Sequence, residues 1–356
     1  MKKIGIDARL YSQTGVGTYL QNFIYQLGKL SPSGLSFYIY LLPQDMVKIK
    51  LDNKNFIART VSSRWHTVAE QTLFLKILYG DDLDLMHFTY FGSPILYQRR
   101  FIATIHDTTP LLFKTGKAST KNPLVYSVKH FFFMQILANQ VKQAQTIITP
   151  TQTVKKQLLE IYGEQYSDKI VPIYEGVSES LISAKENTVL KNKFREFFIY
   201  VGNFYPHKNI ERLIEAFSQV KTDTSLILIG PNDYFASRLK TKKNIILYPT
   251  ATKEDLVFFY KNAKALIHPS LSEGFGLPLT EAAYFNCPII ASDIPVFKEL
   301  LDGQYLPFDP YNIKDIADKI TGFSARPKKF NYENLLKKYS FEKMAKDTLE
   351  IYKKNI

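Results

Sequence analysis

Short apolar runs alternate with helical patterns along the whole chain, and this alternation constrains the fold more than any other feature. The runs lie at 3–6, 37–42, 85–88, 101–105 and 146–149, and again at 197–201, 225–229, 244–247, 266–268 and 288–292. Strands separated by helices form parallel sheets, and short apolar strands are typical of sheets buried on both faces. The sequence therefore predicts an α/β protein built from two similar halves.

Length and composition agree with two domains. The chain has 356 residues, which is more than one ordinary hydrophobic core accommodates. It is 45% hydrophobic and 22% charged, as expected of a globular protein. The single cysteine, Cys287, excludes an internal disulfide framework and fits a reducing cytosol. We find no signal-peptide pattern and no apolar run long enough for a transmembrane helix, so we expect a cytoplasmic protein.

A glycine-rich loop follows the apolar run 266–268 and leads into a helix. Pro278 suits the first helical turn, where its missing N–H would have no partner. Backbone N–H groups and the positive end of the helix dipole then form a site for a phosphate or another anion. Two carboxylates bracket the loop, Glu273 at its start and Glu281 in the first turn of the helix, and carboxylates are strong acceptors for hydroxyl groups. Anion donors flanked by hydroxyl acceptors suit a sugar nucleotide. The residues of the loop itself are Gly274, Phe275, Gly276 and Leu277.

The Glu-x7-Glu spacing with Gly-Phe-Gly inside it closely resembles the signature of retaining glycosyltransferases of family 4, which have the GT-B fold. The resemblance covers nearly the whole chain, and its specific part lies in the second half. It implies two Rossmann-like domains whose parallel sheets face each other across a cleft. We expect an N-terminal acceptor-binding domain at 1–178, a linker at 179–193, a C-terminal nucleotide-sugar-binding domain at 194–335, and a terminal helix at 336–356 that crosses back to the N-terminal domain.

Ligands of such sheets bind beyond the carboxyl ends of the strands. Gly202 and Asn203 follow the run 197–201, and Lys208 precedes an amphipathic helix. A lysine there opposes the helix dipole unless an anion offsets both. The resemblance implies that Lys208 binds the donor diphosphate. Many family members carry a base where this chain has Asn203, so Lys208 carries more of the diphosphate charge here, or Arg212 helps.

Two further motifs end strands of the first half. Gly15 and Gly17 open a helix at 18–27, where backbone N–H groups can approach a ligand, although a tight structural turn explains them equally well. The resemblance implies that this loop lines the cleft. His106, beside Asp107, ends the run 101–105; it is either satisfied by backbone or, as the resemblance implies, in contact with the transferred sugar. The stretch before the linker resembles the family as well, and we expect Glu175 there to shape a turn.

The net charge of +13 is unevenly distributed. Between Arg99 and Lys156 the only acidic residue is Asp107. The bases of this segment are Arg99, Arg100, Lys114, Lys117, Lys121, Lys129, Lys142, Lys155 and Lys156, and Phe113, Tyr126 and Phe131–Phe133 lie among them. Such a segment fits an anionic membrane surface or nucleic acid, or it is a solvated face beside core aromatics. We expect the membrane, with Phe131 itself packed in the core.

Metal chemistry has little support in the sequence. Asp82 and Asp84 match an Asp-x-Asp metal motif of a different glycosyltransferase fold, but they precede a buried strand, where acids are usually solvated. We find no zinc spacing and no P-loop. We therefore expect neither a metal nor a cofactor.

These observations combine into one functional hypothesis. The chain is predicted to be a retaining hexosyltransferase at the inner face of the membrane, moving mannose from GDP-mannose to a glycan or glycolipid hydroxyl. Lys208 and the N–H groups of residues 274–276 would stabilise the leaving diphosphate, Glu281 would bind the ribose, and Glu273 with His106 would hold the sugar. The resemblance implies that the leaving phosphate accepts the acceptor's proton. Alternatives are a UDP-glucose- or UDP-GlcNAc-dependent enzyme, a GT-B epimerase or phosphorylase, and a nucleic-acid-binding protein.

Overall fold

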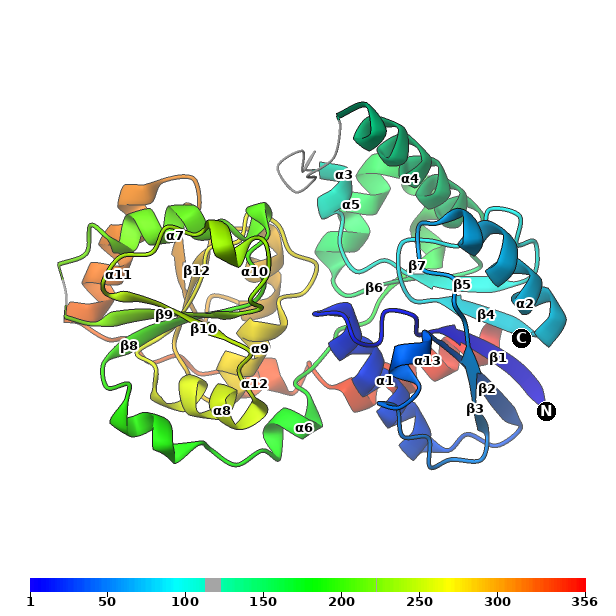
Figure 1. Cartoon of the computed structure of the whole chain (residues 1–356), viewed down its shortest axis with the longest axis horizontal. Coiled ribbons are helices and arrows are strands. Elements are labelled where there is room, and N and C mark those ends of the chain that lie inside the picture. Colours follow the sequence, from blue (N-terminus) through cyan, green and yellow to red (C-terminus); the bar gives the residue numbers. More distant parts are fainter. Residues whose placement is uncertain (113–122, 222) are drawn as a thin grey trace. The chain divides into compact units, whose positions relative to one another are not determined.

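The computed structural model describes residues 1–112, 123–221 and 223–356; the side chains of residues 112 and 123–129 are not described either. The chain divides into two compact units, one of Met1–Glu175 with Phe341–Ile356 and one of Gly176–Ser340 (Figure 1). Each unit contains one parallel sheet with helices packed against it. The predicted α/β class and the two similar halves are confirmed.

The first unit is built on a seven-stranded parallel sheet with the order β3-β2-β1-β4-β5-β6-β7. Its strands are β1 (Lys2–Asp7), β2 (Leu35–Leu41), β3 (Phe56–Thr60), β4 (Leu85–Phe88), β5 (Phe101–Thr104), β6 (Ile147–Thr149) and β7 (Ile170–Pro172). The central strands are fully buried, which explains why they read as continuous apolar runs.

The helices of the first unit are mostly crossovers between these strands. They are α1 (Val16–Leu30), η1 (Pro43–Asp45), η2 (Glu70–Phe74), α2 (Leu75–Asp81), α3 (Thr109–Leu112), α4 (Pro123–Gln143), α5 (Gln152–Tyr162), η3 (Glu164–Lys169) and α13 (Phe341–Asn355). Among them η2 is a single π-helical turn that continues directly into α2. Such turns are rare and frequently lie at functional sites.

The second unit has a six-stranded parallel sheet with the order β10-β9-β8-β11-β12-β13. Its strands are β8 (Phe197–Val201), β9 (Ser225–Gly230), β10 (Ile245–Pro249), β11 (Leu266–His268), β12 (Ile289–Ser292) and β13 (Leu306–Phe308). Its helices are α6 (Glu179–Ile182), η4 (Thr188–Asn192), η5 (Pro206–Lys208), α7 (Ile210–Phe217), η6 (Ala236–Arg238), α8 (Lys253–Asn262), α9 (Leu277–Tyr284), α10 (Pro295–Leu301), α11 (Ile313–Ala325) and α12 (Glu333–Leu336).

Each sheet has one position at which the strand order reverses direction. In the first unit this switch lies between β1 and β4, and in the second it lies between β8 and β11. In parallel sheets of this kind, ligands bind in the crevice beyond the carboxyl ends of the two strands at the switch. The loops after these four strands are therefore where binding sites are expected.

The structure differs from the sequence prediction at the edges of the sheets. Strands β3, β7 and β13 lie outside the predicted apolar runs, because short edge strands that are only partly buried carry little apolar patterning. Residues 179–193, predicted to be a linker, belong to the second unit and include α6 and η4. Leu181 and Leu190 are buried there, and Asn187 donates to Asp255 of α8 at 2.7 Å.

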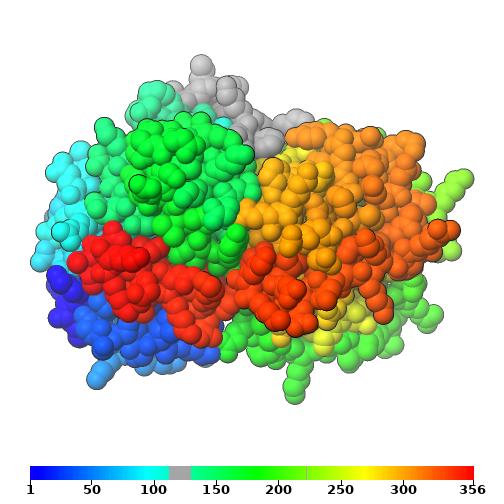
Figure 2. Space-filling model, turned by 180° about the vertical axis from the view of Figure 1, so that it is seen from behind, coloured from blue at the N-terminus to red at the C-terminus, as the bar shows by residue number. Residues whose placement is uncertain are grey.

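Helix α13 belongs to the first unit, although it is the last element of the chain. It packs against α1, and Tyr352 of α13 bonds Nδ1 of His87 in β4 at 2.7 Å. Figure 2 shows this red C-terminal segment exposed along one side of the molecule, beside the blue N-terminal residues. Burial lowers the pKa of His87 to about 3, so this internal hydrogen bond involves a neutral imidazole.

Candidate active site

The clearest polar cluster of the second unit lies beyond β8 and β11, the two strands at its switch point. The carboxylate of Glu273 accepts three hydrogen bonds on the same oxygen, Oε1. The donors are Nζ of Lys208 at 2.5 Å, Oγ of Ser270 at 2.9 Å and Nε2 of His268 at 3.0 Å. Two residues predicted separately, Lys208 and Glu273, are therefore joined directly.

This pair is largely withdrawn from solvent: the side chains of Lys208 and Glu273 are 14% and 10% exposed. Burial alone would raise the pKa of Glu273, but the charge of Lys208 and the hydrogen bond from His268 outweigh it and hold that pKa well below its ordinary value. Glu273 is thus an anion at every physiological pH. All three of these hydrogen bonds end on Oε1, and a carboxylate can accept on its second oxygen, Oε2, as well.

His268 and Ser270 are site residues that the sequence reasoning missed. His268 ends β11, and burial lowers its pKa despite the neighbouring carboxylate. Its Nδ1 is buried without a hydrogen-bond partner in the described part of the chain. A proton there would lack an acceptor, so the ring is neutral and carries its proton on Nε2. His106 was selected because it is a polar residue at the end of an apolar run. The same criterion could have identified His268.

The glycine-rich loop after β11 forms the predicted entry to a helix. Gly276 is the N-cap of α9 with φ 98°, a left-handed conformation that favours glycine, and Leu277 and Pro278 begin the helix. Phe275 is buried, and its ring meets Tyr339 edge-on at 5.7 Å. The loop therefore directs the N-terminus of α9 toward the switch point, with Phe275 as its anchor. Gly274 connects this anchor to Glu273.

Glu281 lies in the second turn of α9 and not in the first turn as predicted. The helix already starts at Leu277, one residue before Pro278, so Glu281 is its fifth residue. Burial raises the pKa of Glu281 to about 7, although Tyr260 donates to its Oε2 at 2.7 Å and partly opposes this shift. Unlike Glu273, this carboxylate changes its charge near neutral pH.

Two other predicted residues follow β8. Gly202 has φ 148°, and a Cβ there would lie 2.8 Å from the hydroxyl of Tyr200, so only glycine fits without a shift. Asn203 accepts a hydrogen bond from that hydroxyl on its backbone oxygen at 2.6 Å. This tight turn brings the chain back over the end of the sheet, which positions η5 and Lys208.

Arg212 is engaged in contacts with neighbouring residues of the second unit. Its Nη1 donates to Oδ1 of Asn209 at 2.8 Å, and its guanidinium stacks over Tyr311 at 5.6 Å. Asn209 in turn donates to the carbonyl oxygens of Pro269 and Pro310. Arg212 therefore braces the loop after β11 through Asn209. Its assistance to Lys208 on a diphosphate stays a prediction.

In the first unit, the predicted glycine loop caps α1. Gly15 is the N-cap with φ 73°, and a Cβ at Gly17 would lie 2.7 Å from the carbonyl oxygen of Tyr11. Gly17 is therefore explained by close packing, whereas the surroundings of Gly15 are open enough for a Cβ. A structural explanation therefore exists for both glycines, close packing at Gly17 and the positive φ at Gly15, and contact with a ligand stays a prediction for both.

His106 lies just beyond β5, and both of its ring nitrogens face acceptors. Nε2 lies 2.9 Å from the carbonyl oxygen of Thr89, and Nδ1 lies 3.4 Å from Oε1 of Glu175. The ring of Tyr19 packs edge-on against it at 4.6 Å. A sugar would therefore displace one of these contacts or use the carbon edge of the ring. Glu175, expected only to shape a turn, also places a carboxylate beside His106.

The acids considered as metal ligands are bound to bases of the chain. Asp84 accepts from Nζ of Lys2 at 2.7 Å and from the backbone of Lys3 at 2.8 Å, and Asp82 accepts from Arg99 at 2.6 Å. Within residues 1–112, 123–221 and 223–356, no group of three or more His, Cys, Asp or Glu side chains is arranged to hold a metal ion.

The basic segment 99–156 is only partly described, because Phe113, Lys114, Lys117 and Lys121 lie outside the described residues, as do the side chains of Tyr126 and Lys129. Phe131 and Phe132 on α4 are 59% and 58% exposed, so the expectation that Phe131 packs in the core is wrong. Phe133 instead turns inward against Phe91, because helical geometry points successive residues in different directions. No helix in the described part of the chain is long and apolar enough to cross a membrane.

Comparison with known proteins shows that the chain with these two sheets is a glycosyltransferase. The profile of the family described as Glycosyl transferases group 1 matches residues 182–341. The O-antigen chain mannosyltransferase RfbU of Salmonella typhimurium is 30% identical over 258 residues, spanning 69% of this chain and 71% of that protein. The chain belongs to the glycosyl transferases group 1 family.

Two further comparisons agree with this family and its fold. The serotype-specific mannosyltransferase WbdA of Escherichia coli is 28% identical over 239 residues, which span 60% of this chain but 28% of that protein. The structure of sucrose-phosphate synthase from Thermosynechococcus elongatus superposes with a TM-score of 0.78 at 16% identity, covering 99% of each chain. The predicted GT-B fold and glycosyltransferase class are confirmed.

Proposed function

We propose that this protein transfers a hexose, with retention of anomeric configuration, from a nucleotide-diphosphate sugar to a hydroxyl of a glycan or lipid-linked acceptor. The observation that carries this proposal is the joining of Lys208 and Glu273 beside the N-terminus of α9, at the switch point of the second unit. A cation, a helix N-terminus and a hydroxyl acceptor are then available in one place.

The proposed chemistry depends on negative charge that develops on the leaving diphosphate. Lys208 and the N–H groups of residues 274–276 stabilise this charge without reorganisation. Glu281 accepts hydrogen bonds from the ribose hydroxyls, and Oε2 of Glu273 accepts from the sugar. His106 holds the sugar from the first unit. The leaving phosphate oxygen receives the acceptor's proton on the same face, so neither an enzymic nucleophile nor a metal is needed.

The proposed donor is GDP-mannose. Support comes from the names of the relatives, since RfbU and WbdA are both mannosyltransferases. Glycine-rich loops bind any diphosphate, so residues 274–276 do not discriminate between nucleotides. UDP-glucose and UDP-GlcNAc are the competing donors.

The test is saturation-transfer NMR of the whole chain with GDP-mannose, UDP-glucose and UDP-GlcNAc, followed by turnover of whichever donor binds. We expect GDP-mannose to receive saturation on both its base and its sugar, and the product to keep the anomeric configuration of the donor. Preference for a UDP-sugar would show that GDP-mannose is not the donor. A product with inverted anomeric configuration would exclude the retaining mechanism. Absence of binding by every nucleotide sugar would refute the proposal.

We further propose that the first unit lies on the inner face of an anionic membrane and that the acceptor is lipid-linked. This rests on the excess of bases in residues 99–156 and on the exposed rings of Phe131 and Phe132. Bases close to an anionic surface each contribute roughly 1 kcal/mol, and apolar side chains add burial in the interface.

A further inference from the structure

Glu175 is a buried carboxylate of the first unit that the proposed chemistry does not use. It lies three residues beyond β7, and its Oε1 is 3.4 Å from Nδ1 of His106. Both side chains keep a little exposed surface, 7% for Glu175 and 10% for His106, so a ligand can reach the pair from outside. The chemistry of this contact therefore bears on how His106 holds a sugar.

The imidazole of His106 carries a proton on Nε2. That nitrogen lies 2.9 Å from the carbonyl oxygen of Thr89, and a carbonyl oxygen can only accept. In a neutral imidazole the other nitrogen, Nδ1, is then an acceptor. It faces the carboxylate of Glu175, which is an acceptor as well. Two buried acceptors cannot satisfy each other, so each gains a hydrogen bond when a ligand brings donors.

The aromatic rings that pack against His106 are neutral. Tyr19 of α1 lies edge-on at 4.6 Å, and its hydroxyl is 3.3 Å from Oγ1 of Thr104. The same Oγ1 lies 2.8 Å from Nε2 of His87. Burial raises the pKa of Tyr19 and lowers the pKa of His87 to about 3, so neither is charged at neutral pH. This packed, hydrogen-bonded wall keeps the imidazole from turning its Nδ1 away from Glu175.

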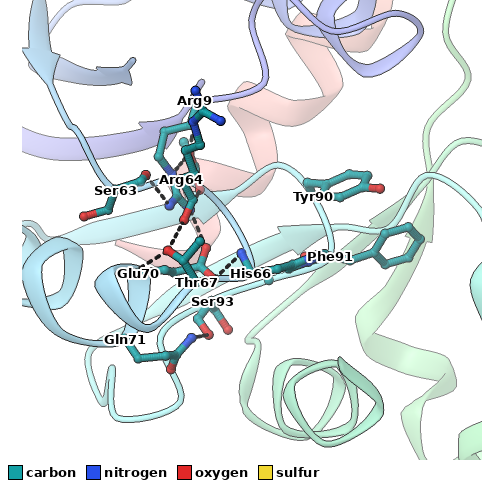
Figure 3. A network of polar contacts seen from close by, with 12 residues as sticks. Arg9, Ser63, Arg64, His66, Thr67, Glu70, Gln71, Tyr90, Phe91 and Ser93 are labelled. Carbon is teal, nitrogen blue, oxygen red and sulfur yellow. Dashed lines mark hydrogen bonds and ion pairs between the residues drawn. The ribbon is translucent and has the colours of Figure 1, made fainter. Parts of the chain in front are cut away.

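Thr89, the acceptor for Nε2, is fixed by buried charges beyond β1. Its Oγ1 donates to the backbone oxygen of Asp7. The side chains of Asp7, Arg9 and Glu70 form the Arg9 cluster. Arg9 is 2% exposed and donates to the two carboxylate oxygens of Asp7 at 2.8 and 2.6 Å and to Glu70 at 2.7 Å. Figure 3 shows Arg9 directed toward Glu70 of η2 and the carbonyl oxygen of Ser63. Breaking such buried pairs is costly, so the end of β1 holds Thr89 in place.

The segment 66–71, which leads into η2, fixes the loop after β4 that Thr89 begins. Nε2 of His66 lies 2.6 Å from the carbonyl oxygen of Phe91, and Gln71 donates to the carbonyl oxygen of Ser93 at 3.3 Å. Gln71 also accepts from the backbone of Ile95 at 2.8 Å. Thr89 is therefore held from both directions and acts as a positioning residue for His106, because its carbonyl decides which nitrogen carries the proton.

A ligand with two adjacent hydroxyl groups matches the pair. Each hydroxyl has one O–H to donate, so one can donate to Glu175 while its neighbour donates to Nδ1 of His106. Adjacent hydroxyls of a hexose lie close enough together for two acceptors that are 3.4 Å apart. A phosphate would instead bring negative charge beside a buried carboxylate, where water screens weakly. The two acceptors therefore suit a neutral vicinal diol.

We infer that Glu175 and Nδ1 of His106 together accept hydrogen bonds from two adjacent hydroxyls of the transferred hexose. The inference rests on the proposed function, in which His106 holds the sugar, and adds Glu175 as a residue that contacts it. Glu175 then contributes to the choice of sugar, because a hexose whose hydroxyls point elsewhere makes one of these bonds and not both.

Glu175→Gln tests this inference, because an amide carries a donor as well as an acceptor. Its N–H can donate to Nδ1 of His106 and join the two side chains without a ligand. We expect the melting temperature to rise by roughly 2 °C or more. Turnover of the donor that the wild type uses should fall by about tenfold or more, since the sugar loses both acceptors. GDP affinity should stay unchanged.

The matched control is Glu160→Gln, which makes the same change at an exposed position of α5 and should leave melting temperature, turnover and GDP affinity unchanged. A lower melting temperature in Glu175→Gln would indicate that Glu175 pairs with a charged imidazole and would overturn the inference. Wild-type turnover in that variant would overturn it as well.

Nitrogen-15 NMR of the whole wild-type protein examines the imidazole directly. With the His106 resonances assigned through His106→Ala, we expect a proton on Nε2 and none on Nδ1 at pH 8. A protonated Nδ1 would contradict the inference. The melting and NMR measurements need no turnover, so they decide on Glu175 even if no nucleotide sugar is a substrate. Conversely, turnover by the wild type can support the proposed function while these measurements reject the role of Glu175.

Discussion

The ammonium group of Lys208 donates to Oε1 of Glu273 across 2.5 Å, although 65 residues separate the two in the sequence. The charge of Lys208 keeps Glu273 ionised in a setting that excludes most water. A bound diphosphate would compete with Glu273 for Lys208. The pair is therefore both a structural contact of the second unit and the proposed point at which the donor enters.

Breaking this pair on one side should destabilise the protein. Lys208→Gln or Glu273→Gln leaves one buried charge without its partner, which should cost about 3–5 kcal/mol of unfolding free energy, and the double variant should recover much of the loss. The measurement is urea denaturation of all three variants. Lys314→Gln, which breaks an exposed pair with Asp318, is the control and should leave the unfolding free energy nearly unchanged. Additive losses in the double variant would contradict the coupling.

The same two positions should separate diphosphate binding from sugar binding. Lys208→Ala should weaken nucleoside diphosphate binding and abolish turnover, because it removes the cation beside the diphosphate. Glu273→Ala should also lose turnover, yet its nucleoside diphosphate affinity should be kept or increased, because Lys208 is released from its carboxylate. Calorimetry with GDP and a turnover assay distinguish the two, and His106→Ala should behave like Glu273→Ala. Near-normal turnover in Glu273→Ala would show that its sugar role is wrong.

Binding of the nucleoside diphosphate should depend on pH through Glu281. Because burial raises the pKa of Glu281 to about 7, its carboxylate is mostly protonated at pH 6 and mostly ionised at pH 8. A ribose hydroxyl donates best to the ionised form, so affinity should rise with pH across this range, by up to about tenfold. Glu281→Gln should bind more weakly and lack this rise, apart from the titration of the ligand itself. An identical pH profile in both proteins would exclude the ribose role.

The same shift predicts an effect of Glu281 on stability. Between the ordinary pKa of 4.5 and the folded-state pKa of about 7, the folded protein holds a proton that the unfolded chain has released. Stability from this group is therefore complete below the lower value and is lost as pH rises through the upper one. Glu281→Gln should raise the melting temperature at pH 8 relative to wild type, and the gain should disappear near pH 4. A gain independent of pH would point to packing and not to charge.

Activity should survive removal of divalent metal. Lys208 and the N-terminus of α9 already supply positive charge where the leaving diphosphate develops its own. Turnover of chelator-treated protein should match that of untreated protein. Loss of activity that manganese or magnesium restores would contradict this expectation and make Asp82 and Asp84 candidates for ligands.

The basic segment should bind anionic liposomes in a salt-dependent way. Flotation of the whole protein should require anionic lipid and decrease as salt screens the attraction. Reversing Lys114, Lys117, Lys121 and Lys129 to glutamate should abolish flotation while donor binding persists. Reversing four exposed lysines of the second unit, Lys221, Lys240, Lys242 and Lys243, is the matched control and should leave flotation largely intact. A wild-type protein that ignores anionic liposomes at low salt would favour a soluble oligosaccharide acceptor.

The sequence by itself determined the architecture and the position of the glycine-rich loop before α9. Both follow from local sequence patterns. Buried parallel strands appear as apolar runs, and Gly276 adopts a positive φ that few other residues tolerate. The short edge strands β3, β7 and β13 were not predicted, because strands that are only partly buried leave no such pattern.

Only the tertiary structure decided how the site residues act on one another. The joining of Lys208 to Glu273, the roles of His268 and Ser270, and the Arg9 cluster all depend on which strand ends become neighbours in a sheet. Glu273 and Glu281 are the same residue type in one motif, yet the pKa of the first is lowered and that of the second is raised to about 7. The difference lies in the partners that share each buried space, since a charge partner and the loss of water act through three-dimensional distance and not through sequence spacing.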